Sequence, residues 1–148
     1  MRIAIGSDHT GVALKGILRE QLVALGHDAE DLGGSGEGSM DYPDVALPLA
    51  EAVAAGRYDL GVLICSNGVG MSIAANKVKG VRAALCHDTF SARRARQHTD
   101  ANVLCLGAWV VGAGAAREVL GAFLEGEFEG GRHARRLDKI KAIEAGGP

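Results

Sequence analysis

Short apolar runs alternate along the chain with longer stretches in which apolar residues recur at helical spacing. A short apolar run bounded by turn residues is typical of a strand that is covered on both faces of a parallel sheet, and the longer spacing is typical of a helix that packs by one side. The pattern predicts strands over residues 2–6, 28–32, 59–65, 81–86 and 102–106. It predicts helices over residues 11–27, 44–56, 71–78, 89–98, 112–126 and 132–146.

Strand and helix alternate throughout, which predicts right-handed βαβ units and an α/β fold with an open parallel sheet. Gly26 and Gly56 stand where a glycine commonly ends a helix. Pro48 lies in the second helical stretch and predicts either a kink or a later helix start. The glycine-rich stretch 33–43 has no periodicity, so it is either a flexible surface loop or a segment that borders the functional site.

Composition narrows the class of protein. A length of 148 residues is typical of one domain, here residues 1–148, and is enough to bury about two thirds of the unfolded surface. The net charge of −2 argues against a nucleic-acid partner, and the basic stretch 130–141 is by itself an ordinary solvated helix face. No apolar run approaches the roughly 20 residues of a membrane span, and the N-terminus lacks a signal-peptide core. We therefore expect a soluble, cytoplasmic protein with no membrane partner.

Polar residues gather at the ends of two predicted strands. "GSDHTG" (6–11) follows the first strand and "CSNGVG" (65–70) follows the third. Ligands of open α/β sheets bind beyond the carboxyl ends of the strands, so both clusters are candidate site segments. Gly68 and Gly70 would let the backbone approach a phosphate or an oxyanion and present its N–H groups. The second cluster lacks the GxxxxGK[ST] P-loop, the third small residue of a dinucleotide fingerprint and the closing arginine of a cysteine-phosphatase loop.

The three cysteines differ in their positions along the predicted elements. Cys65, Cys86 and Cys105 have neither CxxC nor Cys/His spacing, which argues against a disulfide framework and a zinc site. Cys105 lies inside a strand, and we expect it and Cys86 to be buried structural thiols. Cys65 lies where a strand end faces a helix N-terminus, whose dipole and N–H groups favour a thiolate that acts as base or nucleophile. His9, beside Asp8 in the first polar cluster, is also a candidate site residue.

Five blocks of the sequence resemble, in the same order, the ribose-5-phosphate isomerase B family. They span nearly the whole chain: "GSDHTG", "DYPDVA" (41–46), "MSIAANKVKGVRAALCHD" (71–88), "RQHTDANVLCLG" (96–107) and "FEGGRHARR" (128–136). That family also includes the subunits of galactose-6-phosphate isomerase. The resemblance implies a three-layer Rossmann-like sandwich with a five-stranded parallel sheet. It also implies a homodimer or a dimer of dimers that shares each active site between two subunits, with no metal and no cofactor.

By the same resemblance, the reaction interconverts an aldose phosphate and a ketose phosphate by ring opening and proton transfer through a cis-enediolate. Cys65 is similar to the family's catalytic base, and Met71 stands where some members carry a glutamate instead. His98, by position alone a plain cation at a helix end, resembles the ring-opening acid/base. Asp8, with a catalytic part, and His9 resemble residues that line the sugar or phosphate end. The other implied substrate-binding residues are Ser66, Asn67, Gly68, Gly70, Thr99 and, on a C-terminal helix over about 131–145, the phosphate-binding Arg132 and Arg136.

Three departures from the family pattern leave the substrate open. Ser66 and Asn67 replace a Gly-Thr pair, Thr99 stands where an asparagine is usual, and Trp109 stands where an arginine is common. Exchanging an arginine for a tryptophan replaces a charged fork by an apolar plane. Ribose 5-phosphate is the expected substrate. The alternatives are another sugar or sugar phosphate, such as a tetrose or a hexose, and a non-catalytic protein that binds sugar phosphates.

Overall fold

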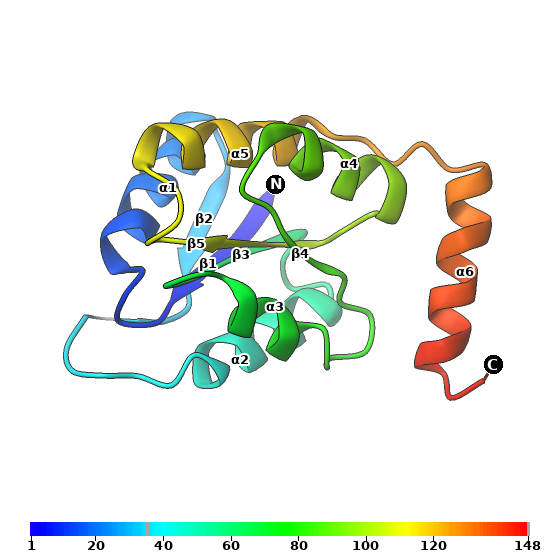
Figure 1. Ribbon diagram of the computed structural model, residues 1–148, viewed down its shortest axis with the longest axis horizontal. Coiled ribbons are helices and arrows are strands. Elements are labelled where there is room, and N and C mark those ends of the chain that lie inside the picture. The colour runs from blue at the N-terminus through cyan, green and yellow to red at the C-terminus, as the bar shows by residue number, and fades with distance from the viewer. Residues whose placement is uncertain (35, 148) are drawn as a thin grey trace.

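The computed structural model describes residues 1–34 and 36–147, and it contains the predicted strands and helices in the predicted order (Figure 1). The strands are β1 (Arg2–Ser7), β2 (Asp28–Asp31), β3 (Leu60–Cys65), β4 (Ala83–Leu85) and β5 (Val103–Gly107). The helices are α1 (Val12–Ala24), α2 (Pro43–Ala54), α3 (Val69–Ala75), α4 (Thr89–Thr99), α5 (Ala113–Glu125) and α6 (Arg132–Glu144). Over the part of the chain that is described, none of these helices is long and apolar enough to cross a bilayer.

The sheet is parallel throughout, with the strand order β2-β1-β3-β5-β4. Figure 1 shows α1, α4 and α5 on one face of the sheet and α2 and α3 on the other, which confirms the expected three-layer α/β sandwich. The strand order changes direction between β1 and β3. In an open parallel sheet, such a switch opens a crevice at the carboxyl ends of the two strands.

Two apolar layers hold the strands between the helices. All residues of the central strand β3 are buried, because helices cover both faces of the sheet. One layer, which includes Leu104 and Phe123, lies between the sheet and α1, α4 and α5. The other, which includes Leu49 and Leu63, lies between the sheet and α2 and α3. Close packing of this kind gives the side chains at the strand ends well-defined positions.

The bounds of α2 and β4 differ from the sequence prediction for reasons that the structure shows. α2 begins at Pro43 and continues through Pro48, so the later start that Pro48 suggested is wrong. Proline is well tolerated in the first turn, and the packing of the buried face of α2 offsets the hydrogen bond that Pro48 cannot donate. β4 is shorter than the predicted 81–86. Its ladder starts late because the Arg82 N–H donates to Asn102 Oδ1 at 2.8 Å.

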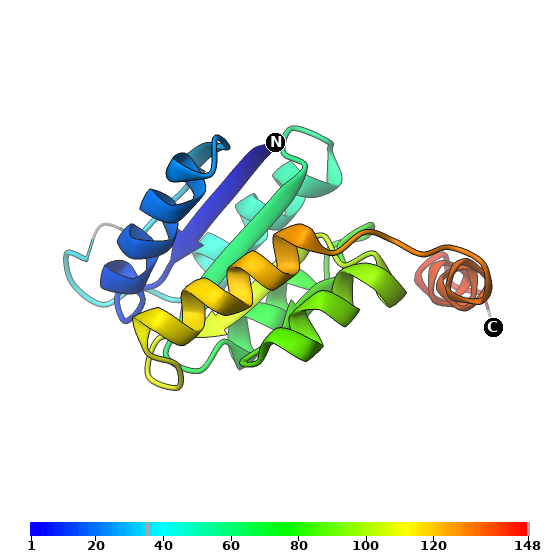
Figure 2. The ribbon, with the colours of Figure 1, turned by 90° about the horizontal axis from the view of Figure 1, so that it is seen from above.

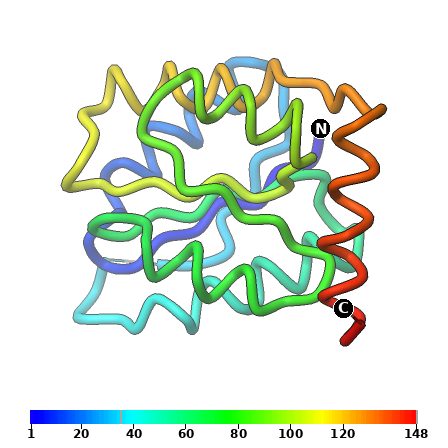
Figure 3. Tube along the Cα trace, turned by 45° about the vertical axis from the view of Figure 1, so that its right-hand side comes forward, coloured from blue at the N-terminus to red at the C-terminus, as the bar shows by residue number. Residues whose placement is uncertain are grey.

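Helix α6 lies outside the three layers. Figures 2 and 3 show it beside the sandwich, beyond the end of α4 and after an extended linker. His133 and Leu137 are its buried side chains, and near its end Glu144 accepts a hydrogen bond from the Gly80 N–H at 2.8 Å. A groove of about 480 Å³ lies between α6 and the β4 region, and Ile140 and Ile143 on this groove are 48% and 67% exposed. The body of the chain therefore covers only part of this helix.

The two phenylalanines of α4 and α5 provide a test of the core. Phe123→Ala should lower the free energy of unfolding by about 3–5 kcal/mol because its ring is fully buried. Phe90→Ala, the same change at a side chain that is 67% exposed, should cost less than about 1 kcal/mol. Urea denaturation at one fixed protein concentration would measure both, and equal losses would contradict this description of the core.

Candidate active site

A cleft opens at the carboxyl ends of β1 and β3, where the strand order switches. Its volume is about 360 Å³. Its position agrees with the expectation that ligands bind beyond the strand ends at the switch point. The residues that line it are Asp8, Tyr42, Cys65, Ser66, Asn67, Val69, Gly70 and Ile73.

Cys65 ends β3 at the floor of this cleft. Its side chain is buried, and its sulfur accepts a hydrogen bond from the Gly68 N–H at 3.1 Å. Gly68 has a φ of +76°, and a Cβ atom there would lie 2.6 Å from Leu85 Cδ1 and 2.9 Å from the carbonyl carbon of Leu106. Only glycine fits this turn, because both the backbone conformation and the space exclude a side chain. The turn therefore holds one N–H group against the sulfur.

The other N–H groups of the turn are not equally available. The Val69 N–H donates to Asn67 Oδ1 at 3.0 Å, so the Asn67 side chain closes the start of α3. The first backbone bond of that helix runs from the Ser72 N–H to the Gly68 carbonyl at 3.0 Å. The N–H groups of Gly70 and Met71 precede it and have no partner within the helix. Among the N–H groups of this segment, those in the first turn of α3 are therefore the ones left without an internal partner.

Asp8 and His9 follow β1 on the other side of the switch. Asp8 is 6% exposed, and its Oδ1 accepts hydrogen bonds from the Thr10 N–H at 2.9 Å and the Thr10 hydroxyl at 2.6 Å. These bonds orient the carboxyl group toward the cleft that it lines. His9 is exposed, and its Nδ1 accepts a hydrogen bond from the Met40 N–H at 3.1 Å. That bond places the ring proton on Nε2, where it can be donated to an anion.

Tyr42 is a cleft residue to which sequence reasoning assigned no role. Its ring packs on the turn: a Cβ atom at Gly70 would lie 2.6 Å from Tyr42 Cζ. Tyr42 and Met40 both belong to the stretch 33–43, so the end of this stretch borders the site, as one of its two interpretations predicted. Ser35, in the same stretch, lies outside the described residues. The block "DYPDVA" was the available signal for Tyr42.

The other two cysteines have the buried positions that the sequence predicted. Burial raises the pKa of Cys86 to about 11, and the nearby carboxylate of Asp88 adds to the effect. Burial raises the pKa of Cys105 still further. Both thiols therefore stay protonated at neutral pH, which excludes them as bases.

A second polar cluster forms where the end of α4 meets the start of α6. The rings of His98 and His133 stack with their centroids 4.0 Å apart and their planes 10° apart. Glu129 Oε2 lies 3.8 Å from His98 Nε2 and 3.6 Å from His133 Nε2. Arg132 and Arg136 are exposed on α6, and neither forms an ion pair with a described residue. These two guanidinium groups are available to an anion.

The three donor atoms of His98, Glu129 and His133 lie within 4.8 Å of one another, a ligand set that zinc accepts. The stacked rings do not suit zinc coordination, however. An ion between the two ring nitrogens would lie outside both ring planes, whereas a histidine ligand holds its metal in the plane of the ring. Arg94 also lies 3.9 Å from Glu129 and adds positive charge. The geometry favours contacts among the three side chains over coordination of a cation.

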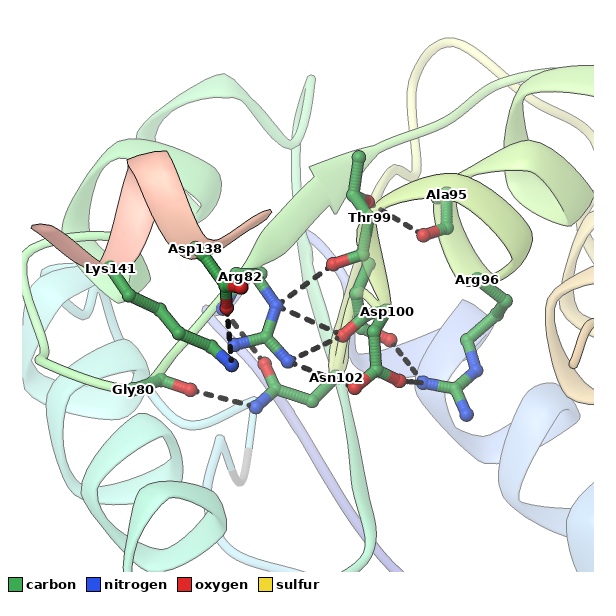
Figure 4. Close-up of polar contacts among 10 residues, drawn as sticks. Gly80, Arg82, Ala95, Arg96, Thr99, Asp100, Asn102, Asp138 and Lys141 are labelled. Atoms are coloured by element: carbon green, nitrogen blue, oxygen red, sulfur yellow. Dashed lines mark hydrogen bonds and ion pairs between the residues drawn. The ribbon is translucent and has the colours of Figure 1, made fainter. Parts of the chain in front are cut away.

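Two arginines fix the backbone at Thr99 and Asp100, at the end of α4 (Figure 4). Asp100 ends α4 with a φ of +45°, which is rare for a residue other than glycine. Arg82 Nη2 donates to the Asp100 carbonyl at 2.8 Å and to its Oδ2 at 3.2 Å, and Arg96 Nη1 donates to its Oδ1 at 3.1 Å. The Thr99 hydroxyl donates to the Ala95 carbonyl at 2.6 Å, so it is engaged within the helix.

The two clusters lie at opposite ends of the strands: the cleft is at the carboxyl ends, and the second cluster is near the amino ends. Cys65 pairs with Gly107 at the carboxyl ends of β3 and β5, whereas Val103, just after the second cluster, pairs with Gly61 near the amino end of β3. At about 3.3 Å per residue, the four steps from Gly61 to Cys65 span roughly 13 Å. One copy of the chain thus divides the predicted site residues between two places. The cleft holds Asp8, Cys65, Ser66, Asn67, Gly68 and Gly70, and His9 lies beside it. The second cluster holds His98, Thr99, Arg132 and Arg136.

Three comparisons with known proteins point to one family. A model of the family described as Ribose/Galactose Isomerase matches residues 3–140. The D-erythrulose-4-phosphate isomerase of Pectobacterium atrosepticum is 46% identical, over 97% of this chain and 95% of its own. The structure of Clostridium thermocellum ribose-5-phosphate isomerase B has a TM-score of 0.97 at 49% identity and covers 99% of each chain. That of Mycoplasma genitalium ribose-5-phosphate isomerase B with bound ribulose-5-phosphate has a TM-score of 0.94 at 46% identity, covering 97% of this chain and 96% of that one.

Thiol reactivity tests the description of the cleft. Iodoacetamide at about pH 8 should alkylate Cys65 first, because its side chain lines the cleft, whereas Cys86 and Cys105 do not line it and burial raises the pKa of both. Mass spectrometry of peptides after partial labelling would locate the modified residue. Cys65→Ser should remove the fast phase, and labelling of Cys86 at the rate of Cys65 would contradict the assignment.

Proposed function

The chain belongs to the ribose/galactose isomerase family, and on that premise we propose that it converts ribose 5-phosphate into ribulose 5-phosphate with Cys65 as the base. The observation that carries the proposal is the sulfur of Cys65, which lines the cleft, accepts the Gly68 N–H at 3.1 Å and shares the cleft with the carboxyl group of Asp8. A thiol held by a backbone donor at a strand end suits abstraction of a proton alpha to a carbonyl. The ribulose-5-phosphate bound by the Mycoplasma genitalium protein supports the choice of substrate.

In the proposed mechanism, the sugar ring opens first. His98 gives a proton to the ring oxygen as the C1–O bond breaks, and Asp8 takes the proton of the anomeric hydroxyl, so that an aldehyde forms at C1. Cys65 then removes the proton from C2, which gives a cis-enediolate. The proton of the C2 hydroxyl passes to the oxygen on C1, and Cys65 returns a proton to C1, which gives the ketose. N–H groups in the first turn of α3, at Gly70 and Met71, would stabilise the oxygen that gains negative charge.

We propose that each site is completed by a second copy of the chain, in a homodimer or a dimer of dimers. Support comes from the separation of the two clusters, because neither edge of the sheet alone offers a base, an acid and phosphate-binding cations. Apolar side chains around the cleft and on α6 are exposed and available for an interface, Ile73 by 57% and Ile143 by 67%. Arg132 and Arg136 of one copy would then face the phosphate bound by the other, where two guanidinium forks offset a dianion.

A second candidate function is isomerisation of a different sugar phosphate. The similarity to a D-erythrulose-4-phosphate isomerase favours a tetrose. Trp109 supports this alternative. Its backbone N–H donates to the Ser66 carbonyl at 2.9 Å, which places this residue beside the Cys65 turn, and its side chain is 76% exposed. A bulky indole ring, in place of the guanidinium group of an arginine, would leave room for a shorter sugar. A non-catalytic sugar-phosphate-binding protein fits less well, because simple binding does not require a thiol at the floor of the cleft.

We also place this activity in the cytoplasm. All three cysteines are free. Thiols stay reduced in the cytosol and are oxidised in most extracellular compartments. An isomerase with a cysteine base requires the reducing environment.

A coupled assay tests the isomerase proposal. The wild type should form ribulose 5-phosphate from ribose 5-phosphate, and Cys65→Ala should lower kcat by about 10²–10⁴-fold, the usual contribution of a positioned base. Cys86→Ala is the matched control and should keep its turnover. A higher kcat/KM for erythrose 4-phosphate than for ribose 5-phosphate would favour the tetrose alternative, and turnover of neither would favour the binding protein.

Complementation between subunits tests the shared site. Cys65→Ala and His98→Asn should each be inactive, but a mixed dimer purified by two different tags should regain about half of the wild-type turnover, because one of its two sites carries neither change. A mixed dimer of Cys65→Ala and Asp8→Asn is the control. Both changes lie in the same cleft, so it should stay inactive. Failure of the first mixture to recover would place the whole site within one chain.

A further inference from the structure

The ring of His133 forms a flat surface on which His98 rests. The centroids are 4.0 Å apart, with an interplanar angle of 10°. His133 is only 5% exposed, whereas the side chain of His98 is 35% exposed. One face of the His98 ring is therefore covered by a fixed neighbour, and the remaining part of the ring is open to solvent or to a ligand.

One carboxylate oxygen of Glu129 lies near both rings. Glu129 Oε2 lies 3.8 Å from His98 Nε2 and 3.6 Å from His133 Nε2. His133 Nε2 is buried and has no hydrogen-bond partner among the described residues. Polar contacts at catalytic groups are often longer in a free protein than in its complex, and a small rotation of Glu129 would bring its oxygen to hydrogen-bond distance.

Charges around the cluster set the protonation of the buried ring. Burial lowers the pKa of His133, and His98 and Arg132 lower it further. His133 is therefore neutral near neutral pH. A protonated His98 ring would then stack on an uncharged ring and would not be repelled by it. Other charged groups that face the cluster are Arg94 on α4, 3.9 Å from Glu129, and Arg136 on α6. Glu129 is the negative group among them.

We propose that Glu129 and His133 are positioning residues for His98: His133 packs against its ring, and Glu129 accepts the proton of its Nε2, so that Nδ1 faces the sugar. The proposal rests on the proposed function, in which His98 is the acid/base of ring opening. A carboxylate that orients an imidazole holds the proton of the neutral ring on Nε2 and stabilises the imidazolium, as the Asp does in the Ser-His-Asp triad. In the imidazolium form, the Nδ1–H of His98 is the proton given to the ring oxygen.

The proposal assigns these residues to one step of the reaction. Ribose 5-phosphate is a ring that must open, whereas ribulose 5-phosphate is open-chain because its 5-hydroxyl carries the phosphate. Exchange of the C1 proton of ribulose 5-phosphate with solvent needs only the base and the enediolate. Loss of Glu129 or of the His133 ring should therefore impair conversion of ribose 5-phosphate and leave this exchange intact.

The first experiment measures both reactions in the same variants. Glu129→Gln keeps the shape and removes the charge, and it should lower kcat for ribose 5-phosphate by at least about 10-fold, part of the roughly 10²–10⁴-fold effect of an acid–base group. KM and deuterium exchange at C1 of ribulose 5-phosphate in D₂O should stay at the wild-type values. Glu125→Gln is the matched control, because Glu125 forms an exposed ion pair with Arg93 of α4 at 3.4 Å and lies away from His98.

Two substitutions separate packing from chemistry at His133. His133→Ala removes the flat surface and should lower kcat for ribose 5-phosphate, while His133→Phe keeps a ring and should restore most of it. A Phe variant as slow as the Ala variant, with C1 exchange intact in both, would overturn the packing role. Loss of C1 exchange as well as ring opening would also overturn it, because the change would then reach beyond His98.

Nitrogen NMR provides a readout independent of turnover. In protein labelled with ¹⁵N-histidine, His98 of the wild type should carry its proton on Nε2, and Glu129→Gln should convert it to a mixture of tautomers. A wild-type His98 protonated on Nδ1 would overturn the proposal. If the wild type neither converts ribose 5-phosphate nor exchanges the C1 proton, the proposed function fails, and the NMR result still decides whether Glu129 orients His98.

Discussion

The direction of the strands is the constraint on which the rest of the structure depends. All five strands run parallel, so their carboxyl ends share one edge, and helices on both faces leave only the edges open to a ligand. The strand order switches between β1 and β3, which places Asp8 and Cys65 on the two sides of one cleft. The same constraint sends His98 to the opposite edge, because α4 returns antiparallel to the strands and ends just before β5 begins. This separation is the basis of our proposal that a second copy of the chain completes the site.

Close packing of the backbone explains how the thiol is held. A Cβ atom at Gly107 would lie 2.7 Å from Asn67 Cα, so the turn after β3 lies directly against the end of β5. Gly68 turns the chain with its positive φ and directs its N–H at the sulfur of Cys65. Tyr42 covers the next glycine of the turn from the other side. A thiol in such a turn is fixed by steric contacts with its neighbours, which favours a single orientation.

Positive charge dominates the second cluster. Arg94, Arg132 and Arg136 surround one carboxylate, Glu129, and the buried ring of His133 is neutral because burial disfavours its charged form. A phosphate dianion would balance this excess of charge, and the exposed arginines of α6 are free to bind it. The same helix packs only partly on its own chain, which leaves it available to a partner subunit. The charge of the second cluster and the incomplete packing of α6 both support the proposed arrangement of two chains.

Sequence alone predicted every strand and helix, their order and the α/β class, because apolar periodicity reports directly which side of each element is buried. It also predicted that Cys65, Asp8 and the glycine turn would lie together, as they do in the cleft, because polar residues at strand ends meet at the carboxyl edge of any parallel sheet. Only the tertiary structure placed Tyr42 on Gly70, stacked His133 on His98 and moved His98, Arg132 and Arg136 to the far edge. Those contacts join residues far apart in the chain, and they depend on how whole helices pack and on where the linker before α6 directs that helix. Periodicity within one element carries no information on the packing between elements.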